Sequence, residues 1–582
     1  MIVCSSSKVA NIFLFLISLL SMMSTGISWI PSPGFRRNVA KLITKSTLIT
    51  MAEQTSTARR MASTSTTEAT ETSQSTATPA YNNLVKQLSA ITQLGRCKAV
   101  LSYDQLVFMP SMASGERGAQ LSALASIIHE KSTDSKLLES IKEAQQELQK
   151  MEDGDADVDP DKSILVELEL DSFTKQSRVP AELAAKAASL EASAYAAWVE
   201  AREKSDFSLF SPVLKDCFQT AMDIADAKRG ESDVPLYTQM LDEFEKGMAP
   251  ERIDDVFQEI KDALVPLIAK VMESKDKPSP SPLEGTFPID AQQALSESIV
   301  KKLGFDGDKG RIDISVHPFT ISFSPQDVRI TSRFRADEWY QGLAGTIHEG
   351  GHAMYEQNLG SSPTSIDTAL SMGAHESQSL FWERHVGLSR SFWKWATPLL
   401  KENFEDYNYS PEEVYAAVNQ VVKGFIRVEA DELTYPLHVI LRYGIEKDVL
   451  LGNLDVDDIP QRWNNDMKTL LDMDVPNDAK GCLQDVHWSG LAIGYFPTYL
   501  IGSATAAQLA HYCEKDIPDM YSKIENGEFD DIKAWLTDKI HRHGRRYQSL
   551  DAMLQDQLGE PLNPKYFIKY LTDKYSDLYK LE

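Results

Sequence analysis

The sequence HEGGH at residues 348–352 constrains this chain more than any other feature, because its two histidines can act together only on a helix. Positions i and i+4 lie one turn apart on the same face, so His348 and His352 can bind one metal ion. Glu349 lies beside them, where its carboxylate can take a proton from metal-bound water. The two central glycines each cost a helix interior about 1 kcal/mol, which close approach of another backbone would justify. We therefore predict a closely packed metal-binding helix.

A catalytic metal of this type needs a third protein ligand. A histidine at position 358 would complete the metzincin pattern, but Asn358 excludes that branch. We predict Glu376, in the helical pattern ALSMGAHESQSLFWERHVG, as a ligand supplied by a following helix. Glu356, one turn beyond the second histidine, would crowd the ion, and Glu383 is expected behind the ligands or in solvent. His375 points about 100° away from its neighbour and is expected to hydrogen-bond nearby.

The body of the chain, from residue 81 onward, reads as one helix after another. Residues 410–452 carry apolar residues at helical spacing after a Ser-Pro-Glu-Glu start, with a kink expected at Pro436. Residues 311–335 alternate apolar and polar side chains between turns, which predicts a small antiparallel sheet next to the HEGGH helix. The edge of such a sheet can bind an extended peptide as an added strand. The predicted fold is therefore mostly α, with this sheet beside the metal.

The charge and the cysteines limit the possible partners. The 582 residues carry a net charge of −26 without a basic stripe, which excludes nucleic acid as a partner. The five cysteines form no CxxC pair, so structural disulfides are not indicated. This length suffices for one large helical domain with a substantial core.

The N-terminal part has the composition of targeting segments. Residues 1–26 contain an apolar run at 10–23, too short to span a bilayer but suited to a signal peptide, so no stable membrane span is expected in the mature protein. Residues 27–80 begin basic and free of acidic residues, like a transit peptide, and continue as a low-complexity segment expected to be a disordered linker. The pattern predicts a secretory route or a plastid-type organelle, while initiation at Met51 would give a cytoplasmic form.

Six short motifs lie along the body of the chain: HPF at 317–319, DVRIT at 327–331, HEGGH at 348–352, HESQ at 375–378, IRVEAD at 426–431 and GCLQDVHW at 481–488. In their order and spacing, these motifs together resemble the carboxypeptidase Taq family of metallocarboxypeptidases. The resemblance covers about residues 81–582, which we take as the peptidase domain.

The resemblance implies an almost entirely helical fold with a deep active-site groove, a homodimer, and removal of single C-terminal residues from peptides with broad specificity. It implies one divalent ion per subunit, zinc or cobalt, bound by His348, His352 and Glu376. It also implies that Glu349 acts as general base and then as proton donor.

The family's polar motifs line the groove, so their members are carried over as substrate contacts. These are Arg427, Arg329, His317, His487 and Tyr499. A guanidinium recognises a terminal carboxylate through two parallel hydrogen bonds, and His487 can donate to the oxyanion. Each also has a structural alternative: Arg427 can pair with Asp431 within a helix, Arg329 can be a surface charge, and the histidine and tyrosine can be core residues.

The sequence thus predicts a metal-dependent carboxypeptidase that acts on peptides with a free C-terminus. An endo-oligopeptidase on the same scaffold is the nearest alternative, because it would need no grip on the terminal carboxylate. A metal-free peptide-binding scaffold is a third reading, against which the complete set of ligands and the base argue.

Overall fold

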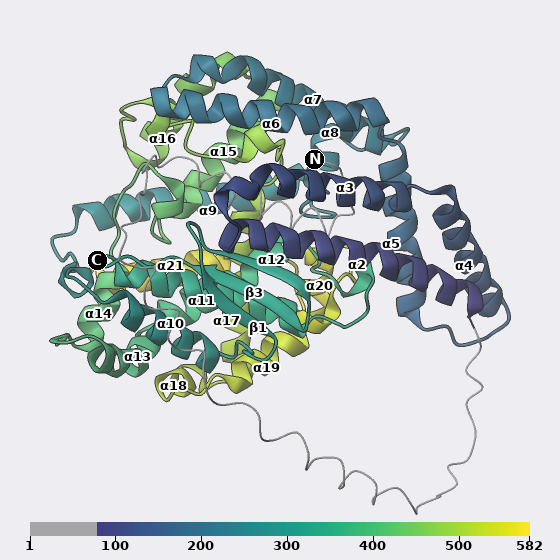
Figure 1. Cartoon of the computed structure of the whole chain (residues 1–582). Coiled ribbons are helices and arrows are strands. Elements are labelled where there is room, and N and C mark those ends of the chain that lie inside the picture. The colour runs from purple at the N-terminus through teal and green to yellow at the C-terminus, as the bar shows by residue number, and fades with distance from the viewer. Residues whose placement is uncertain (1–77, 582) are drawn as a thin grey trace, which may run out of the picture. The chain divides into compact units, whose positions relative to one another are not determined.

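The computed structural model describes residues 78–581, and most of these residues are helical (Figure 1). The predicted signal segment at 1–26, and the transit-like and low-complexity segment as far as residue 77, lie outside the described residues. No helix in the described part of the chain is both long and apolar enough to cross a membrane.

The helices that precede the sheet are α2 (Pro79–Val107), α3 (Ser114–Ser132), α4 (Ser135–Asp153), α5 (Pro160–Ser177), α6 (Ala181–Lys204), α7 (Ser211–Arg229), α8 (Leu236–Leu241), α9 (Pro250–Glu273) and α10 (Ile289–Leu303). The helices that follow it are α11 (Trp339–Asn358), α12 (Met372–Leu380), α13 (Arg390–Asn403), α14 (Pro411–Val418), α15 (Tyr435–Leu450), α16 (Ile459–Leu471), α17 (Pro497–Asp516), α18 (Met520–Glu525), α19 (Asp530–Lys539), α20 (Leu550–Leu558) and α21 (Lys565–Leu578). A π-helical segment, Phe381–Gly387, continues directly from α12.

The Ser-Pro-Glu-Glu start of α14 is confirmed. Ser410 accepts a hydrogen bond from the backbone N–H of Glu413, whose carboxylate in turn accepts from the N–H of Ser410. This reciprocal pair satisfies two N–H groups that the first helical turn leaves without partners.

The predicted continuous helix with a kink at Pro436 is wrong. α14 ends at Val418, and α15 begins at Tyr435 with the proline in its first turn. Proline is well tolerated there, because the first N–H groups of a helix have no intrahelical acceptor. The Asp431 side chain stabilises the turn that leads into α15, because it accepts hydrogen bonds from the N–H groups of Leu433 and Thr434, both at 3.0 Å.

The sheet has three strands, β1 (Gly310–Ile314), β2 (Phe319–Ser324) and β3 (Asp327–Ser332), in the order β1-β3-β2. β2 and β3 form a tight antiparallel hairpin, whereas β1 pairs with β3 in parallel. The sheet is therefore mixed and not purely antiparallel. The alternation of apolar and polar residues in the sequence indicates strands but not their order in the sheet. Here β3 lies between β1 and β2, so the connection from β1 to β2 passes the end of β3. The predicted position beside the metal helix is confirmed: the Thr346 hydroxyl of α11 lies 2.9 Å from the hydroxyl of Ser332 on β3.

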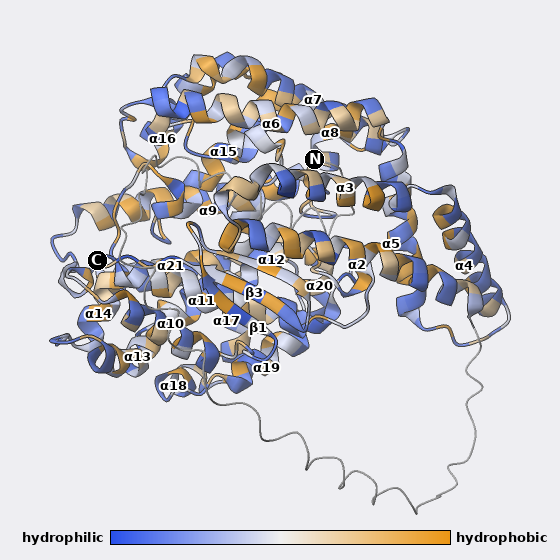
Figure 2. Ribbon diagram, in the orientation of Figure 1, coloured by the Kyte–Doolittle hydropathy of each residue, from blue (hydrophilic) through white to orange (hydrophobic). Residues whose placement is uncertain are grey.

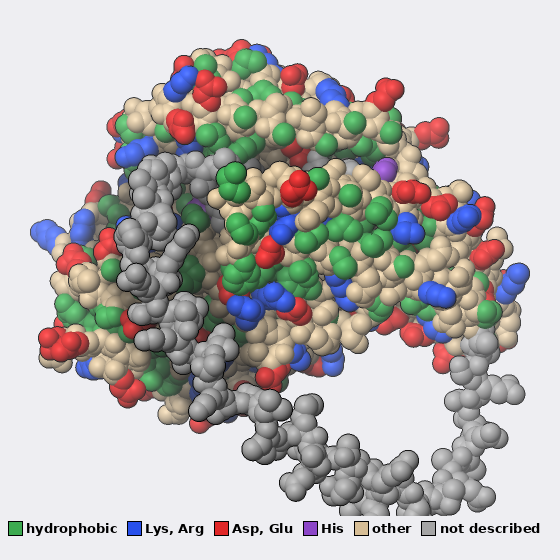
Figure 3. All heavy atoms as spheres, in the orientation of Figure 1, with side chains coloured by type: hydrophobic (Ala, Val, Ile, Leu, Met, Phe, Trp, Pro, Cys, Tyr) green, Lys and Arg blue, Asp and Glu red, His purple; other side chains and the backbone are tan. Residues whose placement is uncertain are grey.

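The main core is built by α6 to α10 together with the helices that follow the sheet, and it includes five fully buried tryptophans: Trp198, Trp339, Trp382, Trp393 and Trp463. A smaller apolar cluster lies between α2, α4 and α5. Figure 2 shows orange bands across the sheet and a mainly blue outer side on α4, as burial of one face predicts. Basic and acidic side chains are interspersed on the face drawn in Figure 3, with hydrophobic side chains gathered over α2 and α3. The four cysteines among the described residues are free thiols.

Candidate metal centre and substrate site

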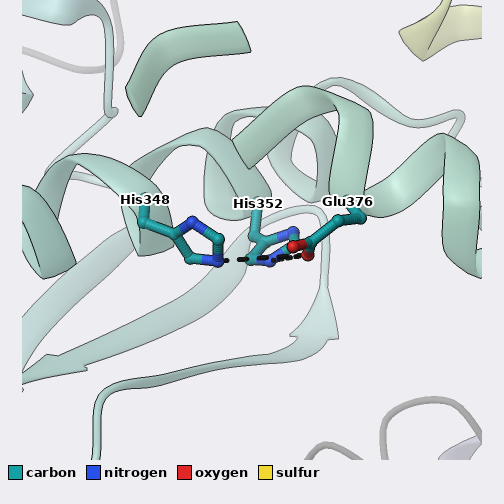
Figure 4. A group of neighbouring side chains, drawn as sticks. All are labelled: His348, His352 and Glu376. Carbon is teal, nitrogen blue, oxygen red and sulfur yellow. Dashed lines mark ion pairs between the residues drawn. The ribbon is translucent and has the colours of Figure 1, made fainter. Parts of the chain in front are cut away.

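The structure brings the three predicted ligands together (Figure 4). α11 supplies His348 and His352 from one face, and α12 supplies Glu376 from the opposite side. Glu376 Oε2 lies 3.4 Å from His352 Nε2 and 4.0 Å from His348 Nε2, and the three ligand atoms lie within 4.8 Å of one another. We call these three residues the metal centre.

Glycines allow the two ligand helices to approach so closely. A Cβ on Gly351 would lie 2.6 Å from both Gln378 O and Ser379 Cα on α12 and the adjoining turn. A Cβ on Gly350 would lie 2.2 Å from Val300 Cγ2 on α10. The prediction that close approach of another backbone explains the glycines of HEGGH is confirmed for Gly351, whereas Gly350 makes room for the side chain of Val300.

A third glycine lies behind the carboxylate ligand. A Cβ on Gly502 of α17 would lie 2.7 Å from both Cβ and Cγ of Glu376. α12 therefore packs between α11 and α17, and it contacts each of them at a glycine, Gly351 on α11 and Gly502 on α17.

Both histidines are oriented by hydrogen bonds at the nitrogen that faces away from the centre. His348 Nδ1 lies 2.6 Å from Glu383 Oε2 of the π-helical segment, and His352 Nδ1 lies 3.1 Å from the backbone oxygen of His375. With a metal ion bound, a proton on each Nδ1 would leave the lone pair of each Nε2 facing the same point as the Glu376 carboxylate. Two imidazole nitrogens and a carboxylate that converge in this way can hold a cation between them.

The converging acceptors match the requirements of a divalent ion. Two imidazole nitrogens and one carboxylate oxygen form a catalytic zinc donor set, and ligands at about 2.0–2.2 Å from one ion would lie roughly 3.3 Å apart. The observed 3.4 and 4.0 Å separations are close to that value. The residues present therefore fit such an ion.

The protonation of the metal-free centre is uneven. Burial opposes the charge on His348, but its hydrogen bond to Glu383 and the nearby carboxylates outweigh burial and raise its pKa to about 10. Burial, together with the charge of His375, lowers the pKa of His352 to about 3. Although burial opposes it, the hydrogen bond to His352 and the charge of His348 lower the pKa of Glu376 to about 2.

Glu349 lies apart from the three converging atoms. Its side chain is buried, and Oε2 accepts a hydrogen bond of 2.6 Å from the hydroxyl of Thr320 on β2. Burial raises its pKa above the ordinary glutamate value. A carboxyl group with a raised pKa can both accept and return a proton near neutral pH.

The other acidic candidates have different partners. The Glu356 carboxylate lies 3.0 Å from His375 Nε2, and the His375 ring stacks on His352 with centroids 4.4 Å apart. Glu356 thus supports the centre from behind, and His375 hydrogen-bonds nearby as expected.

A second group of buried charges lies close to the metal centre. Arg427 directs Nε and Nη2 to Asp485 Oδ1 at 3.1 and 2.8 Å, and the other oxygen of Asp485 accepts from Arg442 Nε at 2.5 Å. Arg427 lies in a single 3-10 turn, so the alternative of an intrahelical pair with Asp431 does not hold. We call Arg427, Arg442 and Asp485 the arginine cluster.

Two further predicted contacts join the arginine cluster. The Tyr499 hydroxyl lies 3.1 Å from His487 Nε2, and the guanidinium of Arg427 lies over the Tyr499 ring at 4.7 Å. Burial lowers the pKa of His487 to about 3, which keeps the ring neutral.

The remaining two predicted contacts lie on or beside the sheet. Arg329 pairs with Asp327 through two hydrogen bonds of 2.9 Å and lies over the rings of Tyr103 and Phe323. His317 precedes β2, where its backbone oxygen lies 3.4 Å from the hydroxyl of Thr331. The structure thus engages Arg329 with partners separate from the arginine cluster.

Sequence reasoning missed several members of the site. The Tyr435 hydroxyl accepts from Arg427 Nη1 at 3.4 Å, and buried Arg384 lies over the Tyr435 ring at 4.9 Å while donating to Ser503 at 3.1 Å. Asp485 lies inside the motif GCLQDVHW, which pointed to it, and Tyr435 lies four residues beyond the motif IRVEAD. No local pattern distinguishes Arg384.

A cavity of about 830 Å³ lies beside the metal centre. Its walls come from α2, α3, α5, α6 and β2, and Glu356 and His375 line it next to the back of His352. Neither the three ligands nor Glu349 and Arg427 belong to its lining, so the cavity lies behind the centre.

A HEXXH helix that presents two imidazoles toward a glutamate from a separate helix, with a buried carboxylate beside them, defines a metallopeptidase. The pattern of the family described as Carboxypeptidase Taq (M32) metallopeptidase matches residues 83–575. The chain belongs to this family, and it is a peptide-bond hydrolase.

The match to this chain covers nearly the whole length of its relatives. The chain is 38% identical to carboxypeptidase 1 of Bacillus subtilis over 85% of this chain and 97% of the relative. It is 35% identical to thermostable carboxypeptidase 1 of Pyrococcus furiosus, over 85% and 99%. The crystal structure of the M32 carboxypeptidase from Deinococcus radiodurans superposes with a TM-score of 0.82 at 32% identity, over 86% of this chain and 100% of that chain.

Proposed function

We propose that this metallocarboxypeptidase removes single residues from the C-termini of peptides with broad specificity. The observation that carries the proposal is the adjacency of two features. A metal centre with a buried carboxyl group, Glu349, lies near an arginine whose charge is only partly used, Arg427.

His348, His352 and Glu376 would hold a divalent ion, which would supply Lewis acidity toward the scissile carbonyl and toward a water molecule. Glu349 accepts the proton of the attacking water and returns it to the leaving amine. The Thr320 hydroxyl, 2.6 Å from Glu349 Oε2, holds this carboxyl group in place during both transfers. Neutral His487 can donate a hydrogen bond to the developing oxyanion.

Arg427 is proposed to bind the terminal carboxylate. Asp485 occupies its Nε and Nη2 edge, so the end formed by Nη1 and Nη2 is left for a ligand, next to the Tyr435 hydroxyl. A buried guanidinium fork gives a strong, oriented pair with a carboxylate.

A free-ended peptide and its C-terminal amide test this proposal. Mass spectrometry of the free-ended peptide incubated with metal-loaded protein should show a ladder of losses from the C-terminus, and amidation should abolish it. Cleavage of the amidated peptide at internal bonds would favour the endo-oligopeptidase, and intact peptides would favour the binding scaffold.

The identity of the ion is proposed as zinc, with cobalt as the second choice, at one ion per subunit. The donor set of two imidazoles and one carboxylate supports zinc. Elemental analysis of protein purified without chelators should return about one equivalent of either metal.

We also infer that the protein is a homodimer. Light scattering across a concentration series tests this, and a constant monomer mass would contradict it.

For the N-terminus, we infer that the native protein begins between Ile27 and Tyr81, after removal of targeting segments. N-terminal sequencing that returned Met1 would exclude this processing.

A further inference from the structure

The helix that carries the third ligand begins against a segment distant in sequence. α12 starts at Met372, and its first N–H groups need partners from outside the helix. The N–H of Met372 donates to the backbone oxygen of Phe244 at 2.9 Å, and the N–H of Gly373 donates to Glu245 Oε2 at 2.8 Å. The Ser371 hydroxyl accepts from Ala374 N at 3.0 Å.

Glu245 is built into this position. Its side chain is 1% exposed, and among the described residues its other oxygen, Oε1, has no hydrogen-bonding partner. Residue 373 is a glycine because a Cβ there would lie 2.5 Å from Glu245 Oε2. The neighbours of Glu245 fix the segment: Asp242 pairs with Lys175 at 2.9 Å and Glu243 with Lys228 at 2.7 Å.

The lateral and axial positions of α12 depend on different contacts. Gly351 and Gly502 let α11 and α17 approach α12 from two sides, and they fix how far apart the helices lie. Along the helix axis, α12 is held by hydrogen bonds. His375 bonds to α11 through its ring and its backbone oxygen, and Met372 and Gly373 bond to the segment after α8. Glu376 follows Gly373 within one turn, so the bonds at the start of α12 act directly on its position.

We infer that Glu245 is a positioning residue for the metal centre. By accepting the hydrogen bond of Gly373, it holds α12 at the axial position where Glu376 meets His352. This inference rests on the proposed metal site and deepens it, because it assigns to a residue outside every recognised motif the placement of the third ligand.

The test compares metal binding by wild-type protein with that of the variants Glu245→Ala, Glu245→Gln and Glu243→Ala. Apo-protein is titrated with Zn²⁺ alone by calorimetry, and with Co²⁺ alone while the visible absorption of the bound ion is recorded. Glu245→Ala should weaken metal affinity about 10- to 100-fold, the range for losing a partner of a metal ligand. The Co²⁺ absorption should change in shape and intensity, because the carboxylate ligand shifts.

Two variants separate positioning from a general loss of stability. Glu245→Gln keeps an acceptor oxygen for Gly373 and should restore affinity to within about threefold of wild type. Glu243→Ala removes a neighbouring ion pair that does not touch α12, so it should leave affinity and spectrum unchanged.

If Glu245→Ala does not fold, Gly373→Ala provides a second test. Its Cβ would lie 2.5 Å from Glu245 Oε2 and 2.7 Å from Ile501 Cγ2 of α17, so it displaces the carboxylate and also crowds α17, and it should weaken metal binding at least to a similar extent. Wild-type affinity and spectrum in a folded Glu245→Ala or Gly373→Ala protein would overturn the inference. Failure of the wild-type protein to bind either ion would instead overturn the proposed function.

Discussion

The metal centre and the arginine cluster are both buried groups of charged residues, but they are balanced in opposite ways. In the arginine cluster, Asp485 lies between two guanidinium groups, and their charges hold its pKa far below the ordinary range despite burial. In the metal centre, three acceptors converge with no internal cation except the proton on His348.

This difference separates two kinds of buried polar site. In the arginine cluster one carboxylate serves two guanidinium groups, so one positive charge is left over and can attract an anionic ligand. In the metal centre the surplus is negative and can attract a cation, because unpaired buried charges are costly. The peptidase places the two next to each other, so one can bind the ion and the other the carboxylate end of a substrate.

The largest effect is expected for Glu349→Gln, which should abolish most of the catalytic activity while the metal centre stays intact. Glu349→Gln keeps the size of the side chain but removes the proton acceptor, so turnover should fall about 10²- to 10⁴-fold. Metal content should stay at the wild-type level, as measured by elemental analysis. His348→Ala should instead lose metal and activity together, and normal turnover in Glu349→Gln would contradict the proposed mechanism.

Removing the shared carboxylate of the arginine cluster should lower the stability of the protein. Asp485→Ala leaves Arg427 and Arg442 buried without their shared partner, which should cost about 3–5 kcal/mol of unfolding free energy. Urea unfolding of the metal-free protein measures this cost. The control is the exposed Asp474→Ala, which should not shift the midpoint. An equal midpoint for both variants would mean that the cluster does not compensate its charges as described.

A comparison of Zn²⁺ affinity between two glutamate variants tests which glutamate is the third ligand. Glu376→Ala removes one of three donors and should weaken Zn²⁺ binding at least about 100-fold, more than the loss of a partner behind a ligand. Glu356→Ala affects only the hydrogen bond to His375 and should have a smaller effect in the same titration. The reverse order would reassign the third ligand to Glu356.

The smallest expected signal is a proton count. At pH 7 the metal-free protein carries His348 as an imidazolium, whose pKa is about 10, while His352 is neutral and Glu376 is ionised, with pKa values of about 3 and 2. Metal binding should therefore release about one proton from His348 at pH 7, and the number released should fall as the pH rises through 10. Calorimetry in buffers of different ionisation enthalpy measures the release, and zero release at pH 7 would contradict the asymmetry.

The sequence predicted what depends on local geometry. The spacing of His348 and His352 sets their common face, and the glycines between them indicated a close helix contact that Gly351 makes with α12. The helical character of the chain and the sheet beside α11 also follow from periodicity.

The rest depends on contacts between distant segments. The parallel pairing of β1 and β3 requires the order of strands, which alternation does not contain. Arg384, Gly502 and Glu245 are recognisable only once α17 and the segment after α8 are placed against α12. Arg329 illustrates the converse, because a motif position alone did not reveal that Asp327 engages its guanidinium.

One peptide unit of α12 serves the metal centre twice. The carbonyl of His375 fixes the tautomer of His352, and the next residue, Glu376, supplies the third ligand atom. A displacement of α12 therefore removes a ligand and releases an imidazole in the same event. Loss of the ion should be cooperative as a consequence, so a variant of intermediate affinity would be a mixture of competent and incompetent molecules and not one uniformly distorted site.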